Sequence, residues 1–469
     1  MTVATADKLY DVTRSTCPEC RTLTQARILG REGRVILQTH CAVHGVTEAL
    51  VYSDEAAWLA AQSYAKPGSV PSLFSRTAER GCPDSCGLCP EHEQHVCMPV
   101  VEITDACNLE CPVCLVKNDG VYTMSRPALE GIVERLLAAE GTVQVLNLSG
   151  GEPTLHPEYE SFLEYLSGVE RILRVSVSTN GLRLARDRAF RDLHRKHDVV
   201  ISLQFDGFRE ETYARLRGRA ELAALKRELL DRIVEEDLTA SLTVTLARGV
   251  NEGELAEILS FYFAHDNFVS MTLQPFAHEG GGLAFAHDPM DRVTIPEVVK
   301  LVSESSGGIL QPSDFTPLPC SHPTCFCLSF LLAVEGGGWL PIKRVLAVDE
   351  YLDLIRNRSY IDPEGDGVER MRGLLYDLWS GPVAQLPQSA GALKTIKRLL
   401  GEIDGAGRTS ARQTVRLVER RMKSVFIHQF MDAETFDLTR VRRCCTVYPR
   451  EDGAFYPACV YNVLRRGRC

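Results

Sequence analysis

The stretch TDACNLECPVC, residues 104–114, decides the fold, because it places Cys107, Cys111 and Cys114 in a CxxxCxxC spacing on one short loop. Three thiolates on one loop can hold three of the four irons of a cubane 4Fe–4S cluster. The fourth iron then lacks a protein ligand and is open to a small molecule. Zinc sites and purely structural clusters also use such spacings, so the segments on either side of the loop must decide between these interpretations.

Short apolar runs alternate with amphipathic segments around this loop. The runs predicted to be strands are 99–104, 143–149, 172–179, 199–205, 241–247 and 269–275. The segments predicted to be helices are 128–140, 159–168, 221–236 and 253–265. This alternation is typical of a parallel sheet, and we predict an α/β fold with a partial (β/α)6 TIM-type barrel over residues 98–305. In such barrels the chemistry lies at the C-terminal ends of the strands.

Polar residues stand where three of the predicted strands end. The motifs are SGGEPTLHP at 149–157, SVSTNG at 176–181 and SLQFDG at 202–207. The candidate cofactor-binding residues in them are Ser149, Gly150, Gly151, Glu152, Ser178, Asn180, Ser202 and Gln204.

With these motifs in this order, the chain resembles the radical S-adenosylmethionine (SAM) superfamily. The resemblance implies that Cys107, Cys111 and Cys114 are catalytic and hold a 4Fe–4S cluster whose open iron binds SAM. It also implies reductive cleavage of SAM to methionine and a 5'-deoxyadenosyl radical, with a flavodoxin- or ferredoxin-type protein as reductant. The cofactor carries the difficult chemistry, and the protein supplies positioning.

The resemblance assigns roles to the motif after the second strand. Gly150 and Gly151 would let the backbone approach the methionine part of SAM, and Glu152 would accept hydrogen bonds from its ammonium group. One residue departs from the family pattern: Val113 stands where many members carry an aromatic residue that packs against the adenine. This departure puts the adenine contact in doubt and leaves the cluster assignment intact.

Further cysteines gather outside the barrel, and in a reducing compartment metal binding explains them better than disulfides. Residues 61–97 are rich in Pro, Gly and Ser and contain Cys82, Cys86, Cys89 and Cys97. Four thiolates complete the ligands of a cubane, so we expect an auxiliary 4Fe–4S cluster in this loop region, with structural zinc as one alternative. A second SAM-binding cluster is the other, because Cys82, Cys86 and Cys89 repeat the CxxxCxxC spacing, but no GGE motif follows them closely.

The N-terminal region, residues 1–60, combines the motifs CPEC and CAVH. They supply Cys17, Cys20, Cys41 and His44, a spacing typical of tetrahedral zinc or of a rubredoxin-type iron. We therefore predict a small metal-binding knuckle with a single metal ion. Alternatively, His44 is an ordinary loop residue and not a metal ligand.

The C-terminal region, residues 306–469, is predicted to hold a further auxiliary cluster. Its candidate ligands are Cys320, Cys325, Cys444, Cys445 and Cys459, whereas Cys327 and Cys469 are expected to stay free. Residues 392–430 are predicted to be helical and basic on one side, and Lys394 to Lys423 would either contact lipid headgroups at a membrane surface or form a solvated face.

Composition excludes some classes of partner. The chain has 469 residues and a formal net charge of -10, so it does not attract nucleic acids by charge. No apolar run reaches the roughly 20 residues that span a bilayer, and the N-terminus lacks the pattern of a signal peptide. We expect a cytoplasmic protein with no transmembrane segment.

The whole layout, from the knuckle through CxxxCxxCP and the barrel to PCSHPxC, IHQFMD, RRCC and PACVYN, resembles the tetraether lipid synthase family, earlier grouped with class D radical SAM methylases. That family uses a mononuclear metal site and three 4Fe–4S clusters, one that binds SAM and about two auxiliary ones. The resemblance implies C–C bond formation at an unactivated C–H position of a lipid or another long apolar substrate. His428, Met431 and Asp432 recur in its pattern, with core packing or capping as their alternative role.

Three other functions stay open. One is C-methylation of a pterin-like or other small molecule, and another is oxidative modification of a peptide with help from auxiliary clusters. The third is an iron–sulfur protein without catalysis, which the GGE motif argues against because an electron carrier needs no ammonium-binding loop. Gln274 and His278 follow the sixth strand and would either face the active site or bond to the backbone.

Overall fold

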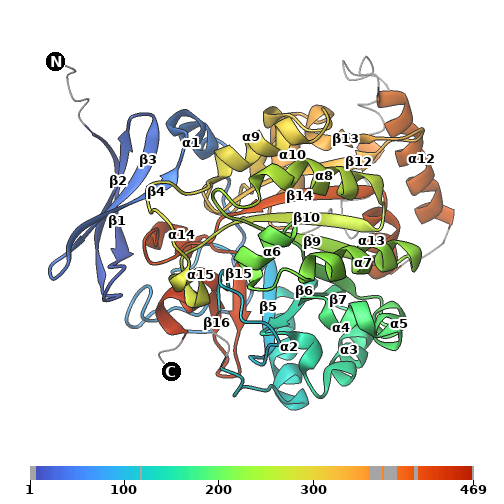
Figure 1. Ribbon diagram of the computed structural model, residues 1–469, viewed down its shortest axis with the longest axis horizontal. Helices are drawn as coiled ribbons and strands as arrows, with labels where there is room; N and C mark the ends of the chain where they lie inside the picture. The colour runs from blue at the N-terminus through green and yellow to red at the C-terminus, as the bar shows by residue number, and fades with distance from the viewer. Residues whose placement is uncertain (1–6, 117–118, 359–371, 374–387, 406–409, 467–469) are drawn as a thin grey trace.

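The computed structural model describes residues 7–116, 119–358, 372–373, 388–405 and 410–466. An antiparallel sheet lies at the N-terminal end, in the strand order β1 (Lys8–Thr16), β2 (Leu23–Arg31), β3 (Arg34–Cys41) and β4 (Gly45–Tyr52). In Figure 1 this sheet stands beside the main body, and α1 (Glu55–Gln62) follows it. The Asp54 side chain caps α1 by accepting a hydrogen bond from the Ala57 amide.

Six parallel strands form the centre of the molecule and neighbour one another in chain order. They are β5 (Met98–Thr104), β6 (Val143–Gly150), β7 (Ile172–Thr179), β8 (Val200–Gln204), β9 (Ala240–Leu246) and β10 (Phe268–Pro275). Each predicted strand is confirmed to within one residue at either end. Buried parallel strands read as continuous apolar runs, which is why the sequence marks them so clearly.

Helices cover the outside of these strands (Figure 1). They are α2 (Arg126–Glu140), α3 (Tyr159–Gly168), α4 (Leu182–Arg186), α5 (Arg188–Lys196), α6 (Glu210–Arg217), α7 (Leu222–Glu235), α8 (Leu255–Ala264) and α9 (Ile295–Ser305). One face of each strand packs against these helices. For example, Val101 and Ile103 of β5 and Ile132 and Leu136 of α2 are fully buried. Burying one such side chain contributes about 1.5–3 kcal/mol, so this layer holds the barrel together.

The C-terminal region continues the barrel sheet at both edges. Beyond β10 lie β14 (Met422–His428), parallel to it, and β12 (Phe326–Ala333), antiparallel to β14. At the other edge β15 (Thr446–Pro449) pairs with β5, and β16 (Phe455–Pro457) pairs with β15. The sequence treats residues 306–469 as a region of their own, but the strands described within it belong to the same sheet as the barrel.

The remaining C-terminal elements lie around these strands. They are β11 (Thr316–Pro317), β13 (Trp339–Pro341), α10 (Val348–Ile355), α12 (Ser389–Gly405), α13 (Ala411–Glu419), α14 (Leu438–Arg442) and α15 (Ala458–Val460). The prediction that residues 392–430 are helical throughout is wrong at its end, because β14 occupies residues 422–428. Val425 and Ile427 are fully buried there, and pairing on both sides removes the open edge that β10 would otherwise expose.

Candidate active site

The loop with Cys107, Cys111 and Cys114 leaves the end of β5 and packs directly against the end of β6. The Gly151 amide donates to the Thr104 carbonyl at 2.8 Å, and the Glu152 amide donates to the Ala106 carbonyl at 2.7 Å. A Cβ atom on Gly150 would lie only 2.0 Å from the Thr104 oxygen. Glycine is required because the two backbones touch. In the structure, the two glycines approach the cysteine loop, a contact that the sequence did not reveal.

Glu152 ties the same motif to the end of β7. Its buried carboxylate accepts from the Thr154 hydroxyl at 2.6 Å, from the Thr179 hydroxyl at 2.7 Å and from the Asn180 amide at 2.7 Å. The Asn180 side chain in turn donates to Asn108 in the cysteine loop at 2.7 Å. Glu152 therefore joins three strand ends, and the expected contact with the SAM ammonium group would use its remaining acceptor capacity.

The three cysteines of the loop lie half-buried together. Burial raises the pKa of the Cys107 thiol to about 11, and burial likewise raises the pKa of Cys114. Arg217 lies next to Cys111, and its guanidinium forms an ion pair with buried Asp206 at 2.6 Å. The buried Cys107 and Cys114 thiols stay protonated by themselves, whereas iron ligation deprotonates a thiol. The donor set fits a 4Fe–4S cluster.

A cavity of about 440 Å³ occupies the inside of the barrel next to this loop. Cys114 borders it on one side, and Cys97 and Cys445 border it elsewhere. Barrel interiors are usually filled by large branched side chains. Here small hydroxyl side chains replace them and leave room for ligands of small-molecule size.

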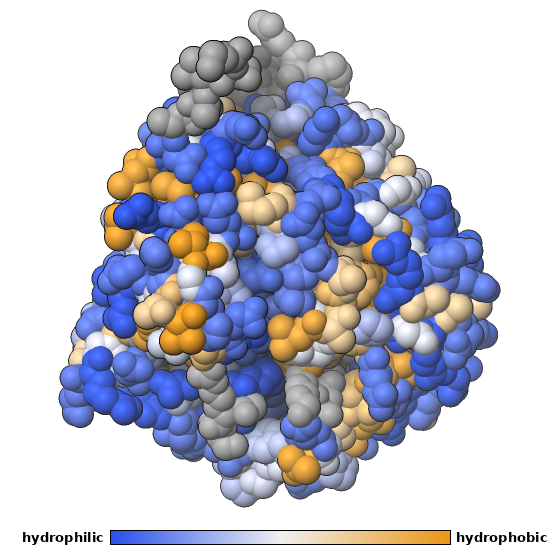
Figure 2. Space-filling view, turned by 60° about the vertical axis from the view of Figure 1, so that its left-hand side comes forward, coloured by the Kyte–Doolittle hydropathy of each residue, from blue (hydrophilic) through white to orange (hydrophobic). Residues whose placement is uncertain are grey.

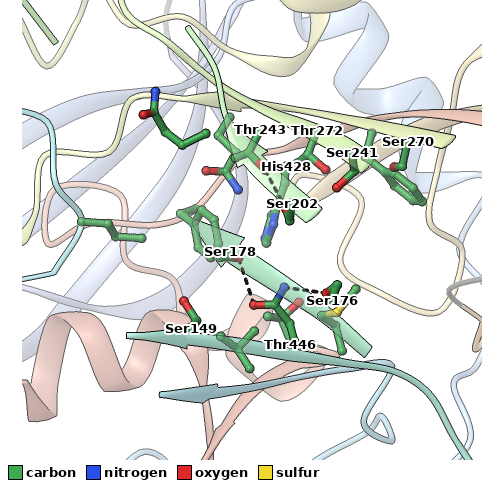
Figure 3. A pocket seen from close by; sticks show the side chains of 18 of the residues that line it. Ser149, Ser176, Ser178, Ser202, Ser241, Thr243, Ser270, Thr272, His428 and Thr446 are labelled. Atoms are coloured by element: carbon green, nitrogen blue, oxygen red, sulfur yellow. Dashed lines mark hydrogen bonds between the residues drawn. The ribbon is translucent and has the colours of Figure 1, made fainter. Parts of the chain in front are cut away.

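Figure 3 shows how these hydroxyl groups converge on the cavity from successive strands. The labelled residues are Ser149, Ser176, Ser178, Ser202, Ser241, Thr243, Ser270, Thr272, His428 and Thr446. Ser202 lies 3.3 Å from the Thr243 hydroxyl, and Asn147 bonds to both Ser176 and Ser178. Alternate residues of a strand point to the same face, so a period-two repeat of Ser and Thr inside apolar runs was the sequence signal that could have identified this lining.

The predicted residues divide between the cavity and its rim. Those that line the cavity are Ser149, Gly150, Ser178, Ser202, Gln204, Gln274 and His428. Gln204 also accepts a 3.0 Å hydrogen bond from Lys226, whose pKa is lowered to about 7 by burial. The others expected at the site, Met431, Asp432 and His278, bond elsewhere in the protein: the Met431 amide donates to the Cys459 sulfur at 3.3 Å, and Asp432 accepts from the His278 amide at 2.8 Å.

His428 projects into the cavity between two phenylalanine rings. Its ring centroid lies 3.8 Å from that of Phe326 and 3.9 Å from that of Phe430. Burial lowers the pKa of His428 to about 3, so the imidazole is neutral at working pH. A neutral imidazole offers one hydrogen-bond donor and one acceptor, which suits a polar ligand rather than a carboxylate.

The N-terminal knuckle brings together the four residues that the sequence selected. Cys17 Sγ lies 3.4 Å from His44 Nδ1, Cys20 Sγ lies 3.9 Å from Cys41 Sγ, and Cys41 Sγ lies 3.6 Å from His44 Nδ1. Tetrahedral zinc with sulfur and nitrogen ligands separates those atoms by about 3.5–3.8 Å. The geometry fits a single Zn or Fe ion.

The other cysteines are grouped differently from their order in the sequence. Cys97 was expected with Cys82, Cys86 and Cys89, but it packs in one apolar cluster with Cys320 and Cys445. Its amide also donates to the Cys445 carbonyl at 3.0 Å.

Cys444 lies near a different set of cysteines, which includes Cys325, Cys459 and Cys86. The buried Arg440 donates to Cys325 at 3.3 Å. Cys445 also lies near Cys444 and Cys325, so the adjacent pair lies between the two cysteine groups, an arrangement that spacing alone does not predict. Cys327 lies within β12, and Cys469 lies outside the described residues.

The basic segment from Lys394 to Lys423 crosses residues outside the described part of the chain. In α13, Arg412 donates to the carbonyls of Ile172 at 2.6 Å and Val169 at 2.7 Å, and Arg416 forms an ion pair with Asp198. These arginines bond within the protein, which favours the interpretation as a packed and solvated helix. No helix among the described residues is long and apolar enough to cross a membrane.

A parallel partial barrel with a CxxxCxxC loop at its C-terminal edge defines the radical SAM class of enzymes. A family model described as the radical SAM superfamily matches residues 101–262, and one described as the HMPTM N-terminal zinc ribbon domain matches residues 9–53. The chain is a radical SAM enzyme, which uses SAM and a 4Fe–4S cluster and carries an N-terminal zinc ribbon.

Individual relatives are similar over different lengths. The 7,8-dihydro-6-hydroxymethylpterin dimethyltransferase of Methanocaldococcus jannaschii is 27% identical over 97% of this chain and 94% of its own length. The GTP 3',8-cyclase of Chlorobaculum tepidum is 28% identical over 38% of this chain and 53% of its own length. Among solved structures, Streptococcus suis SuiB bound to its precursor peptide SuiA covers 45% of this chain at 13% identity, with a TM-score of 0.38.

Proposed function

We propose that this enzyme forms a carbon–carbon bond at an unactivated carbon of a small, planar, polar substrate of the pterin type. The observation that carries the proposal is the single cavity that borders both Cys114 of the SAM-cluster loop and Cys97 and Cys445 of an auxiliary cysteine group. A substrate in this cavity has access to both groups. When bound, the 4Fe–4S cluster supplies the electron that cleaves SAM.

The lining supports a polar heterocycle as substrate. Serine and threonine hydroxyls, together with Asn147, Gln204 and Gln274, offer donors and acceptors around the cavity. The aromatic rings of Phe426 and Phe430 offer flat surfaces for stacking. The relative that matches nearly the whole chain is named for a pterin substrate, which agrees with this chemistry.

A lipid chain is the second candidate, because apolar side chains share the same lining. Val145, Val200, Val269 and Leu318 lie among the hydroxyl groups. The volume of about 440 Å³ is of small-molecule size and is shared with SAM, which favours the compact substrate over a long chain. The face seen in Figure 2 is mostly hydrophilic, with apolar residues in small separate groups, and offers no broad surface for a membrane.

The test supplies the anaerobically reconstituted enzyme with a reductant, SAM labelled in its methyl group, and either 7,8-dihydro-6-hydroxymethylpterin or a diether lipid. The proposal expects two SAM molecules and two electrons from the reductant to be used per methyl group. One SAM gives methionine and, after its radical takes a hydrogen atom from carbon of the pterin, 5'-deoxyadenosine. The other gives its labelled methyl group to that carbon and leaves as S-adenosylhomocysteine. A coupled lipid that carries no labelled methyl group and has lost two hydrogen atoms would support chain coupling and contradict the pterin proposal. Formation of 5'-deoxyadenosine without change in either substrate would contradict both substrate classes.

The hydroxyl lining gives this test a matched control. Ser202→Ala and Thr243→Val remove a facing pair of hydroxyl groups without disturbing the cysteine loop. A pterin substrate should lose affinity by about 5–150-fold, because a lost pair of hydrogen bonds costs about 1–3 kcal/mol. A lipid substrate should be unaffected or bind slightly better.

A further inference from the structure

A second group of candidate metal ligands lies outside the barrel cavity, at the C-terminal edge of the sheet. It consists of His278 and His287, both after β10, and Glu434, after β14. Their candidate ligand atoms all lie within 4.8 Å of one another. His287 Nε2 is 2.8 Å from one carboxylate oxygen of Glu434, and His278 Nδ1 is 3.4 Å from the other.

The hydrogen-bond roles in this cluster are compatible with a bound cation. His278 Nε2 lies 3.0 Å from the Leu283 carbonyl, which only accepts, so Nε2 carries the ring's hydrogen. Nδ1 of the neutral ring is then a lone pair, and it faces an oxygen of Glu434 that is also an acceptor. Two acceptors in this position repel each other unless the ring takes up a second proton or a metal ion lies between them. A ring nitrogen bonded to a backbone carbonyl, with its other nitrogen turned inward, is the usual arrangement of a metal-ligating histidine.

The separations match a metal with nitrogen and oxygen ligands. Bonds of 2.0–2.2 Å place neighbouring tetrahedral or octahedral ligands about 2.8–3.6 Å apart, a range that includes the 2.8 and 3.4 Å found here. The side chains of His278, His287 and Glu434 are 19%, 15% and 13% exposed, so an ion can enter and keep water as a further ligand. Arg292 bonds to the same carboxylate at 3.0 Å and holds it in place.

We infer that His278, His287 and Glu434 bind one divalent transition-metal ion, such as Zn²⁺ or Fe²⁺, separate from the N-terminal ribbon and from the iron–sulfur clusters. Two imidazoles and a carboxylate suit these borderline ions better than Mg²⁺ or Ca²⁺, which prefer oxygen ligands. The ligand set also differs from the three thiolates of the ribbon. This inference does not rest on the proposed substrate.

The position of the ion suggests what it stabilises. The segment between the two histidines contacts the cluster loop, because the Gly282 amide donates to the Cys114 carbonyl at 3.0 Å. It also contacts the ribbon through the 2.6 Å ion pair between Glu279 and Arg21. An ion bound to Glu434 would fix this segment to the chain that follows β14. The site would thus brace the SAM-cluster loop from outside.

The test measures zinc in the anaerobically prepared holoenzyme after incubation with Zn²⁺ and removal of the excess. X-ray absorption at the zinc edge separates the ribbon, with Zn–S near 2.3 Å, from a site with only nitrogen and oxygen ligands at 2.0–2.2 Å. The Cys17→Ser/Cys20→Ser variant should keep one zinc per chain with only nitrogen and oxygen ligands. The His278→Gln/His287→Gln variant should lose one zinc and keep the sulfur-rich signal.

Two further variants protect this test from a folding artefact. Glu434→Gln keeps the side-chain shape and should lose the same zinc, and His265→Gln, a half-buried histidine outside the cluster, should lose none. The content of acid-labile sulfide, which reports the iron–sulfur clusters alone, must stay equal among them as the measure of folding. The inference is overturned when the ribbon variant holds no zinc, or when the double-histidine or Glu434 variant keeps zinc with only nitrogen and oxygen ligands.

Discussion

The replacement of Glu152 by glutamine tests how the GGE motif supports the cofactor site. The carboxylate accepts from Thr154 and Thr179 through one oxygen and from the Asn180 amide through the other. Glutamine has one oxygen only. If that oxygen still accepts the hydrogen bonds from the two threonine hydroxyls, the side-chain NH₂ group faces the Asn180 N–H. Two donors then meet in a buried place.

The structure sets the size of the effect. At least one hydrogen bond to a charged group is lost, at a cost of about 1.5–3 kcal/mol. The lost bond is one that positions Asn180, whose side chain bonds to Asn108 of the cysteine loop. SAM affinity should therefore fall by about 10–150-fold, and the Asn180 amide should exchange its hydrogen faster by a similar factor.

The assay combines equilibrium dialysis of SAM under anaerobic conditions with hydrogen exchange of the peptide that contains Asn180. Glu158→Gln serves as the matched control, since Glu158 is exposed at the start of α3 and should change neither quantity. An affinity within threefold of the wild type, together with unchanged exchange at Asn180, would refute the role assigned to Glu152.

Three more predictions follow from the same structure. Gly150→Ala should abolish cluster incorporation, measured as iron per chain, because its φ of +132° and the Thr104 oxygen leave no space for a Cβ, whereas exposed Gly120→Ala should retain iron. His428→Phe should still cleave SAM but lose most substrate product, measured as the ratio of product to 5'-deoxyadenosine, because it removes the ring nitrogens and keeps the stacking; an unchanged ratio would contradict a role in substrate binding. Burial lowers the pKa of His194 to about 4, so between pH 6.5 and 4 the unfolded chain takes up a proton that the folded one does not, and stability falls as the pH drops. Between pH 7 and 5.5 this effect of His194 lowers the free energy of unfolding by about 1 kcal/mol. His194→Gln should therefore show a smaller drop in Tm over that interval than the wild type, whereas the exposed control His40→Gln should show the same drop as the wild type. Equal drops in all three proteins would contradict the account.

The barrel strands could be predicted because buried parallel strands carry long apolar runs, and the polar strand ends marked the cofactor edge. β14 was missed because its residues follow a basic helix and differ from it only in a short β-branched and aromatic run, 424–427. Its assignment depends on β10 needing a partner, which is a property of the whole sheet.

The cysteine groups show the same limit of local patterns. Spacing put Cys97 with Cys89, yet the chain turns between them so that Cys97 reaches Cys445. The cluster of His278, His287 and Glu434 carries no spacing signal at all, because its members lie in segments that follow two strands, β10 and β14, which meet only in the folded sheet. Sequence motifs do not reveal sets of ligands that only tertiary contacts bring together.

The central claim is that Cys107, Cys111 and Cys114 hold a cluster with one iron open to SAM. The most direct measurement is electron paramagnetic resonance of the reduced enzyme, with and without SAM, in a protein whose other cysteine groups are intact. The account predicts that SAM alters one reduced 4Fe–4S signal and that Cys107→Ala removes both this signal and the formation of 5'-deoxyadenosine. A Cys107→Ala enzyme that still cleaves SAM, or a signal that SAM leaves unchanged, would contradict it.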